Sequence, residues 1–174
     1  METINTNAEI IHVLLKDDGI FPNNEELPLI VYKKAIQFND EGAEVVEDLF
    51  YKNGWGGSWR NGIYSFHHYH STAHEVLGVY SGNCKVQLGG PEGEIFEIEK
   101  GDVILIPAGV AHKNLGSSNN FRVVGAYPKG QNWDMNYGRE GERPEADKNI
   151  RNVNLPSFDP VYKNEGPVMD YWIK

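Results

Sequence analysis

Five of the six histidines in the chain lie between residues 67 and 112, and His68 and His70 stand two positions apart. Side chains on a β-strand alternate between its two faces, so an extended chain here points both imidazoles the same way. Two imidazoles at that spacing can bind one metal ion. The spacing therefore favours a strand-based fold that brings further ligands to the same place.

Two more residues can complete such a site. Glu75 follows residues 71–73, a small polar segment that can turn the chain into a second strand. His112 follows the apolar segment 103–106 and a Pro-x-Gly turn, which can return a third imidazole to the pair. Three imidazoles and one carboxylate suit a divalent transition metal, with Fe, Mn, Ni, Zn and Cu as candidates. The predicted metal ligands are His68, His70, Glu75 and His112.

Two other interpretations of these four residues are a polar cluster without metal and a purely structural ion. Burying several ionisable groups without an ion is costly, which disfavours the first. Structural zinc sites are usually closed by four ligands and rely on thiolates, which disfavours the second. An octahedral ion with one or two positions open to water, O₂ or substrate is the preferred interpretation.

The spacing of these residues resembles the two motifs of the cupin superfamily. The first motif is matched at every fixed position, by Gly62, His68, His70, Glu75 and Gly82. Most of the second is matched, by Gly101, Pro107, Gly109 and His112, whereas Gly116 stands where the family often has Asn. Since that Asn is not a usual metal ligand, the departure concerns the local turn more than the metal.

Three longer segments, residues 59–62, 70–78 and 125–131, resemble the YjlB-like cupins, and the likeness covers residues 50–140. The resemblance implies an all-β protein with few short helices. Its fold would be a double-stranded β-helix, or jelly-roll barrel, with N- and C-terminal extensions and one metal site. The resemblance implies no particular reaction.

Short β-branched and apolar segments between turn residues predict the strands of such a barrel. Residues 76–82 and 83–90 are expected to pair as a hairpin. Within the second of them Cys84 alternates with apolar residues and is expected to be packed rather than nucleophilic. The predicted strands are residues 10–15, 29–32, 60–68, 76–82, 83–90, 94–99, 103–106 and 121–127.

One helix is predicted over residues 42–52, where apolar side chains recur at helical spacing. Residues 53–59 contain three glycines and are expected to form a loop anchored by Trp55 and Trp59. Both indoles can cover an end of the core or contact a ligand, and the first role is preferred because large aromatics commonly dominate cores.

If one strand runs through residues 60–68, its even-numbered side chains share the face of the metal-binding pair. Arg60 and Tyr64 are therefore the catalytic candidates, the first to neutralise a carboxylate or phosphate and the second to donate a hydrogen bond. An ion pair at a strand end is an equal alternative for Arg60, because a β-bulge would break the alternation. His67 is expected to face outward, and His74 to lie at the surface or behind the ligands.

The balance of charges excludes several partners. Sixteen basic and 25 acidic residues give a net charge of −9, which disfavours nucleic acid and anionic membrane surfaces. No apolar run approaches the ~20 residues of a membrane span, and the N-terminus lacks the regions of a secretion signal. The single cysteine gives no sign of an oxidising compartment. We expect a cytoplasmic protein without nucleic-acid or membrane partners.

A chain of 174 residues is expected to form one domain. N-terminal strands and the helix occupy residues 1–50, the barrel core with both metal motifs residues 58–128, and a C-terminal arm residues 129–174, with a short helix near 146–151. Cupin-like barrels often pair through their N-terminal strands. A homodimer is therefore expected, because the two apolar N-terminal strands can complete a neighbour's sheet.

Three classes of function fit this pattern. The first is an enzyme that acts on a small oxygenated or carboxylate metabolite by dioxygenase-like or Lewis-acid isomerase-like chemistry at the metal. The second is a metal- or small-molecule-binding protein without turnover. The third is a storage or regulatory module, which is least favoured because no basic DNA-binding segment accompanies the barrel.

Overall fold

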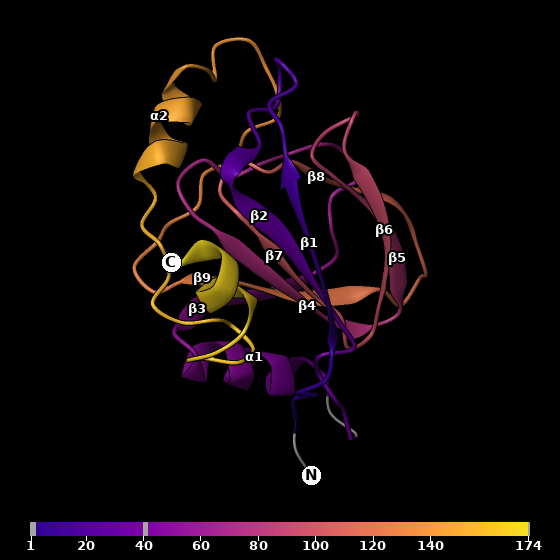
Figure 1. Ribbon diagram of the computed structural model, residues 1–174. Helices are drawn as coiled ribbons and strands as arrows, with labels where there is room; N and C mark the ends of the chain where they lie inside the picture. The colour runs from indigo at the N-terminus through magenta and orange to yellow at the C-terminus, as the bar shows by residue number, and fades with distance from the viewer. Residues whose placement is uncertain (1–2, 40–41, 174) are drawn as a thin grey trace.

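The computed structural model describes residues 3–39 and 42–173, which form two antiparallel sheets (Figure 1). The larger sheet has six strands, in the order β1 (Glu9–Leu15), β2 (Asn24–Lys33), β7 (Val103–Ile106), β4 (Glu75–Ser81), β9 (Arg122–Pro128) and β3 (Trp55–Asn61). The smaller sheet has three strands, in the order β6 (Glu94–Glu99), β5 (Asn83–Leu88) and β8 (His112–Ser117). The all-β jelly-roll prediction is confirmed.

The core between the sheets follows from the alternation of side chains along the strands. On β5 the side chains of Cys84, Val86 and Leu88 are buried, and they meet Leu77 and Ile104 of the larger sheet. The expectation of a packed thiol at Cys84 is confirmed, and burial raises the pKa of this thiol to about 11. All four residues of β7 are buried because both faces of this strand are covered.

A second core covers the outer face of the larger sheet. It includes residues from β2, β4 and β9, from helix α1 (Ala43–Lys52) and from the C-terminal π-helix Val168–Trp172. In Figure 1 this π-helix and helix α2 (Glu145–Asn152) lie on the opposite side of the molecule from β5 and β6. The predicted helices near residues 42–52 and 146–151 are both confirmed. Among the described residues no helix is long and apolar enough to cross a membrane.

The prediction of a hairpin over residues 76–90 is wrong. The segments on either side of Gly82 belong to different sheets, because β4 pairs with β7 and β9 whereas β5 pairs with β6 and β8. Gly82 has φ +71°, and a Cβ there would lie 2.8 Å from the Cα of Phe121. A glycine therefore lets the chain cross from one sheet to the other at this point.

Three further expectations are corrected. The described strands do not close into a barrel, since each of the two sheets keeps its own edges. Residues 53–59 are not a loop throughout, because β3 begins at Trp55. The strand predicted over residues 60–68 ends at Asn61, and a register shift between Gly56 and Trp59 changes which side chains face the core.

Candidate metal centre

Three histidines and a glutamate meet where the two sheets approach each other. His68, His70 and His112 are buried, and one ring nitrogen from each lies within 4.8 Å of the others. Oε1 of Glu75 lies 3.5 Å from Nε2 of His70 and 3.3 Å from Nε2 of His112. The structure therefore groups the three predicted histidines, and Glu75 contacts two of them.

The four predicted ligands come from three parts of the fold. His112 begins β8 of the smaller sheet and Glu75 begins β4 of the larger one. His68 and His70 lie in the connection between β3 and β4, where His68 forms an isolated antiparallel bridge with His112. The backbone N–H groups of His68 and His112 each donate to the other residue's carbonyl, at 3.2 and 2.9 Å, which fixes the two imidazoles side by side.

Backbone carbonyls hold the three imidazoles in one tautomer. Nδ1 of His68 donates to Phe66 O at 3.0 Å, and Nδ1 of His112 donates to Val110 O at 3.1 Å. Nδ1 of His70 donates to Asp134 O at 2.5 Å. A carbonyl only accepts, so Nδ1 carries a proton in each ring, and Nε2 is the nitrogen that can bind a metal once it is unprotonated. Such a bond at the far nitrogen is typical of metal-binding histidines.

The charges in the cluster favour a bound cation. Burial lowers the pKa of His68 to about 3, assisted by the neighbouring His112. Burial by itself would raise the pKa of Glu75, but His70 and His112 bring it well below its usual value. At neutral pH the site therefore contains a carboxylate and an uncharged imidazole at His68, both of which are available as metal ligands.

The C-terminal arm supports His70, which sequence reasoning did not foresee. The Asp134 carbonyl accepts the His70 proton, and the Asp134 carboxylate accepts hydrogen bonds from Ser71 N and from Nδ2 of Asn136, at 2.6 and 3.0 Å. These bonds, with that from Ser71 Oγ, bring the pKa of Asp134 below its usual value against the effect of burial. The arm is therefore tied to the metal-binding segment at Asp134, and a backbone bridge between Tyr69 and Asn136 adds a second attachment.

Replacing Asp134 by alanine is expected to weaken metal binding by about 10- to 100-fold, because the bonds from Ser71 and Asn136 to its carboxylate, which position its carbonyl beside His70, are lost. Competition with a chromophoric chelator measures this affinity. Glu140→Ala, at an exposed position of the same arm, is the control and should bind metal as the parent does. Equal affinities for both variants would contradict a supporting role for Asp134.

A cavity of about 210 Å³ opens above the cluster. Tyr64 stands at its mouth, half-exposed, with its ring edge-on to His68 at a centroid distance of 5.2 Å. Apart from the four predicted ligands, the larger side chains that line the cavity are Trp59, Arg60, Ile63, Tyr64, Leu77, Tyr127, Trp133 and Met135.

The two catalytic candidates differ in how they meet this cavity. Tyr64 faces it freely, whereas Arg60 borders it with its guanidinium turned toward helix α1. Nε and Nη2 of Arg60 donate to the two carboxylate oxygens of Glu47 at 2.6 and 3.0 Å. This geometry is the ion pair given above as the alternative for Arg60. The register shift in β3 explains why the Arg60 side chain points outward, because it turns Trp59 rather than Arg60 toward the core between the sheets.

Two aromatic residues of the cavity, Tyr127 and Trp133, were not singled out as ligand-binding residues, and Trp59 also lines it although cover of the core was its preferred role. Trp59 Nε1 donates to Tyr127 Oη at 2.8 Å, and the ring of Trp133 lies edge-on to His70 at 5.6 Å. Burial and the nearby Glu75 carboxylate raise the pKa of Tyr127, so its hydroxyl stays protonated and can donate. Tyr127 could have been found from the sequence because it lies in the YjlB-like segment 125–131. Trp133 could have been found because it is a large aromatic residue in an otherwise polar arm.

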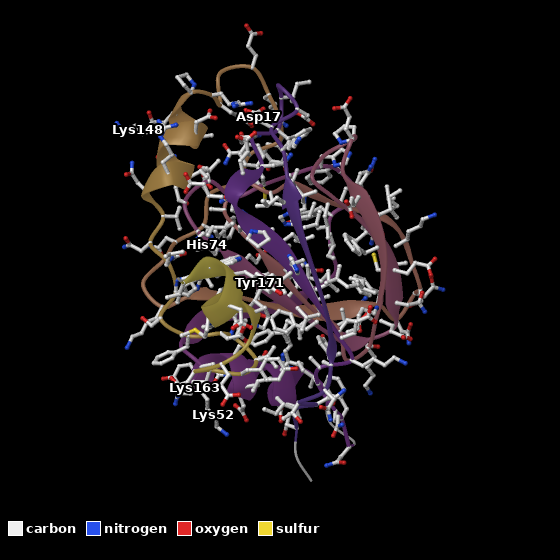
Figure 2. The ribbon with its side chains drawn as sticks, viewed as in Figure 1. Asp17, Lys52, His74, Lys148, Lys163 and Tyr171 are labelled. Carbon is white, nitrogen blue, oxygen red and sulfur yellow. The ribbon has the colours of Figure 1, made fainter. Side chains whose placement is uncertain are left out.

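His67 and His74 both point away from the metal ligands. His67 is half-buried and lies 5.5 Å from the ring of Phe21, so it is not fully external. His74 is buried beside the C-terminal π-helix that carries Tyr171, with its ring 4.8 Å from Trp172 (Figure 2). Its Nδ1 accepts a hydrogen bond from Ala108 N at 2.9 Å and thereby holds the Pro-x-Gly turn that precedes His112.

His74 is expected to make folding sensitive to acid. Burial lowers its pKa from 6.5 to about 3, so the unfolded chain binds a proton more readily than the folded one. Neutral His74 therefore contributes to stability at pH values above 6.5, its pKa in the unfolded chain. This contribution is lost as the pH falls toward about 3, its pKa in the folded protein. From about pH 7 to about pH 5 the loss is about 2 kcal/mol. The variant His74→Asn keeps an acceptor for Ala108 N–H but cannot titrate. Its free energy of unfolding, measured in urea, should therefore fall less between about pH 7 and about pH 5 than that of the parent protein. An equal fall in both proteins would contradict this role for His74.

Comparison with known proteins shows the family. The cupin domain family matches residues 60–123. The uncharacterized protein YjlB of Bacillus subtilis (strain 168) is 41% identical over 158 residues, which cover 91% of this chain and 93% of that protein.

Two solved structures also match, both at low similarity. Acireductone dioxygenase from Bacillus anthracis, with a cadmium ion in its active center, has a TM-score of 0.42 and 15% identity over 74% of this chain and 83% of that one. Procruciferin, an 11S globulin from Brassica napus, has a TM-score of 0.38 and 16% identity over 79% of this chain, which spans only 28% of its length. Neither likeness bears on function. By its 41% identity to YjlB and its cupin motifs, the chain belongs to the YjlB-like cupins.

Proposed function

We propose that this cupin holds one divalent transition metal through His68, His70, Glu75 and His112, and that it binds and transforms a small molecule in the cavity above. The observation that supports this most directly is the fixed tautomer of the three imidazoles. Their Nδ1 protons are all engaged by carbonyls, so Nε2 is the nitrogen that each ring can offer to a cation beside the Glu75 carboxylate.

The donor set fits Fe, Mn, Ni, Zn or Cu. Imidazole suits these ions, a carboxylate supplies one negative charge, and four protein donors leave open positions on an octahedral ion. Bound there, such an ion would polarise a carbonyl or lower the pKa of a bound water. The open positions would face the cavity, where Tyr64 and the protonated hydroxyl of Tyr127 can donate hydrogen bonds to a ligand.

The favoured function is that of a metal-dependent enzyme, with dioxygenase-like or Lewis-acid isomerase-like chemistry as its two forms. A binding protein without turnover is the second candidate, because the same cavity and donors can hold a ligand unchanged. A storage or regulatory module remains the third, and no observed feature favours it.

Metal analysis of the purified protein, followed by anaerobic reconstitution with Fe(II), Mn(II) or Zn(II), tests the proposal. One equivalent of metal per chain is expected. Oxygen uptake by the Fe(II) form against a panel of small oxygenated compounds would identify the oxygenase form. Turnover by the Zn(II) or Mn(II) form without oxygen would identify the Lewis-acid form. Tight ligand binding with no chemical change would favour the second candidate, and failure to retain any of these metals would refute the proposed site.

We also infer a homodimer that forms through the N-terminal strands. β1 is the edge strand of the larger sheet, and its Leu14 side chain is 53% exposed. An exposed edge with an apolar side chain is suited to pairing with a second copy. Light scattering at micromolar concentration should give twice the chain mass, and the mass of a single chain would contradict the inference.

A further inference from the structure

We propose that the ligand of this site is a small, planar, uncharged ring compound that presents one or two neighbouring oxygen atoms to the metal. This inference rests on the proposed function and narrows it, because it replaces the broad class of oxygenated or carboxylate metabolites by one kind of molecule. Size, charge and the shape of the walls each support it.

The volume of the cavity suits a small ring compound. At about 210 Å³ it is somewhat larger than an apolar cavity of about 150 Å³, which is known to accept benzene. It is smaller than the ~300 Å³ at which pockets for drug-sized ligands begin. A six-membered ring with one or two substituents matches this space.

The side chains around the cavity offer a carboxylate ligand no partner of their own. Arg60 is the only Lys or Arg among the described residues that line it, and the Glu47 carboxylate already engages Arg60 through two hydrogen bonds. That contact lowers the pKa of Glu47, so the pair stays charged on both sides at neutral pH. A carboxylate ligand would therefore be held by the metal alone, whose charge Glu75 already partly offsets, whereas an uncharged ring gains contacts with the walls as well.

The walls of the cavity favour a flat molecule. The rings of Tyr127 and Trp133 are nearly parallel, with an interplanar angle of 23° and centroids 6.4 Å apart. The hydrogen bond from Trp59 fixes the position of Tyr127, while Trp133 is 51% exposed and free to adjust. Aromatic faces contact other flat rings well, so these two side chains suit a planar ligand.

Exposed aromatic side chains continue from the cavity to the surface. The rings of Tyr64 and Phe66 are stacked at 4.9 Å, and Phe66 lies 5.8 Å from Tyr137. All three are at least 37% exposed. A cluster of exposed apolar rings beside a pocket commonly marks the approach of an apolar ligand. The path to the metal therefore has the same character as the cavity.

Calorimetric titration of the Zn(II)-loaded protein with three probes tests the inference. Catechol is flat and carries two adjacent oxygens, cis-cyclohexane-1,2-diol carries the same two oxygens on a puckered ring, and malate is a carboxylate. Zn(II) is used because it has no redox chemistry. Catechol is expected to bind at least about tenfold more tightly than either of the others, which corresponds to about 1.4 kcal/mol.

Two variants locate the binding. Trp133→Ala should weaken catechol binding by about tenfold while metal content stays at one equivalent. Tyr51→Ala, which removes an exposed aromatic ring from helix α1 on another part of the surface, is the matched control and should leave the affinity unchanged. Equal or tighter binding of malate or of the diol would overturn the inference, and so would an unchanged affinity in Trp133→Ala.

The experiments distinguish an error in the proposed metal site from an error in the proposed preference for a planar ring. If Zn(II) does not load, the proposed function fails, and the preference for a ring is then measured on the metal-free protein with phenol. Saturation-transfer NMR should show contact between phenol and the parent protein, and a reduced signal for Trp133→Ala. Loaded metal without preference for catechol overturns only the inference about the ligand, as does the absence of a phenol signal in the metal-free protein.

Discussion

Replacing His112 by alanine is expected to abolish metal binding at equilibrium concentrations that saturate the parent protein. The variant keeps only two imidazoles and one carboxylate. The His112 ring also lies 3.3 Å from Glu75 and 4.0 Å from the ring of His68, so the substitution also removes side-chain contacts that hold these two ligands in place. Loss of a residue that merely supports a ligand costs 10- to 100-fold in affinity, and loss of a ligand should cost more than about 100-fold.

Metal content per chain after reconstitution and dialysis measures this effect. His12→Ala is the matched control, because His12 is exposed on β1 and stacks on Tyr171 at 4.1 Å, away from the ligands. The control should retain one equivalent of metal. A His112→Ala protein that also retained a full equivalent would show that the ion binds elsewhere.

That the four proposed ligands lie near one another was predictable from sequence, because their spacing is local and typical of a family. His68 and His70 are two residues apart, and the turns before Glu75 and His112 are encoded by neighbouring small residues, glycines and a proline. The expected grouping agrees with the structure although the expected local geometry was partly wrong, and metal binding by these residues stays a prediction. The two histidines lie in a bridged connection rather than within one long strand.

The surroundings of the site were less predictable because they depend on contacts between distant segments. Asp134 reaches His70 across 64 positions in the chain, and nothing near either residue announces that contact. The outward turn of Arg60 depends on a register shift between β3 and β9 and on Glu47 of helix α1. Similarly, the change of sheet at Gly82 could not be told from a hairpin, because both need a glycine turn between two apolar strands.

Replacing Asp102 by alanine is expected to cost about 3–5 kcal/mol of folding free energy, the largest loss of stability expected of a single charged side chain here. Asp102 is fully buried at the start of β7, where its carboxylate pairs with Lys33 Nζ at 2.5 Å and accepts from the N–H groups of Lys34 and Glu99. Removing the carboxylate leaves a partly buried ammonium and two N–H groups without their acceptor.

The free energies of unfolding of Asp102→Ala and Glu99→Ala, measured in urea, compare the loss of a buried ion pair with the loss of an exposed one in the same turn. Glu99 pairs with Lys34 at 3.3 Å, but their side chains are 53% and 69% exposed, so its loss should cost less than about 1 kcal/mol. The backbone N–H of Glu99 that reaches Asp102 is retained in Glu99→Ala. Because β7 pairs with β4 up to Ile106 and Glu75, Asp102→Ala should also lose metal at lower urea than the control. Equal midpoints for both variants would contradict the importance assigned to burial of this pair.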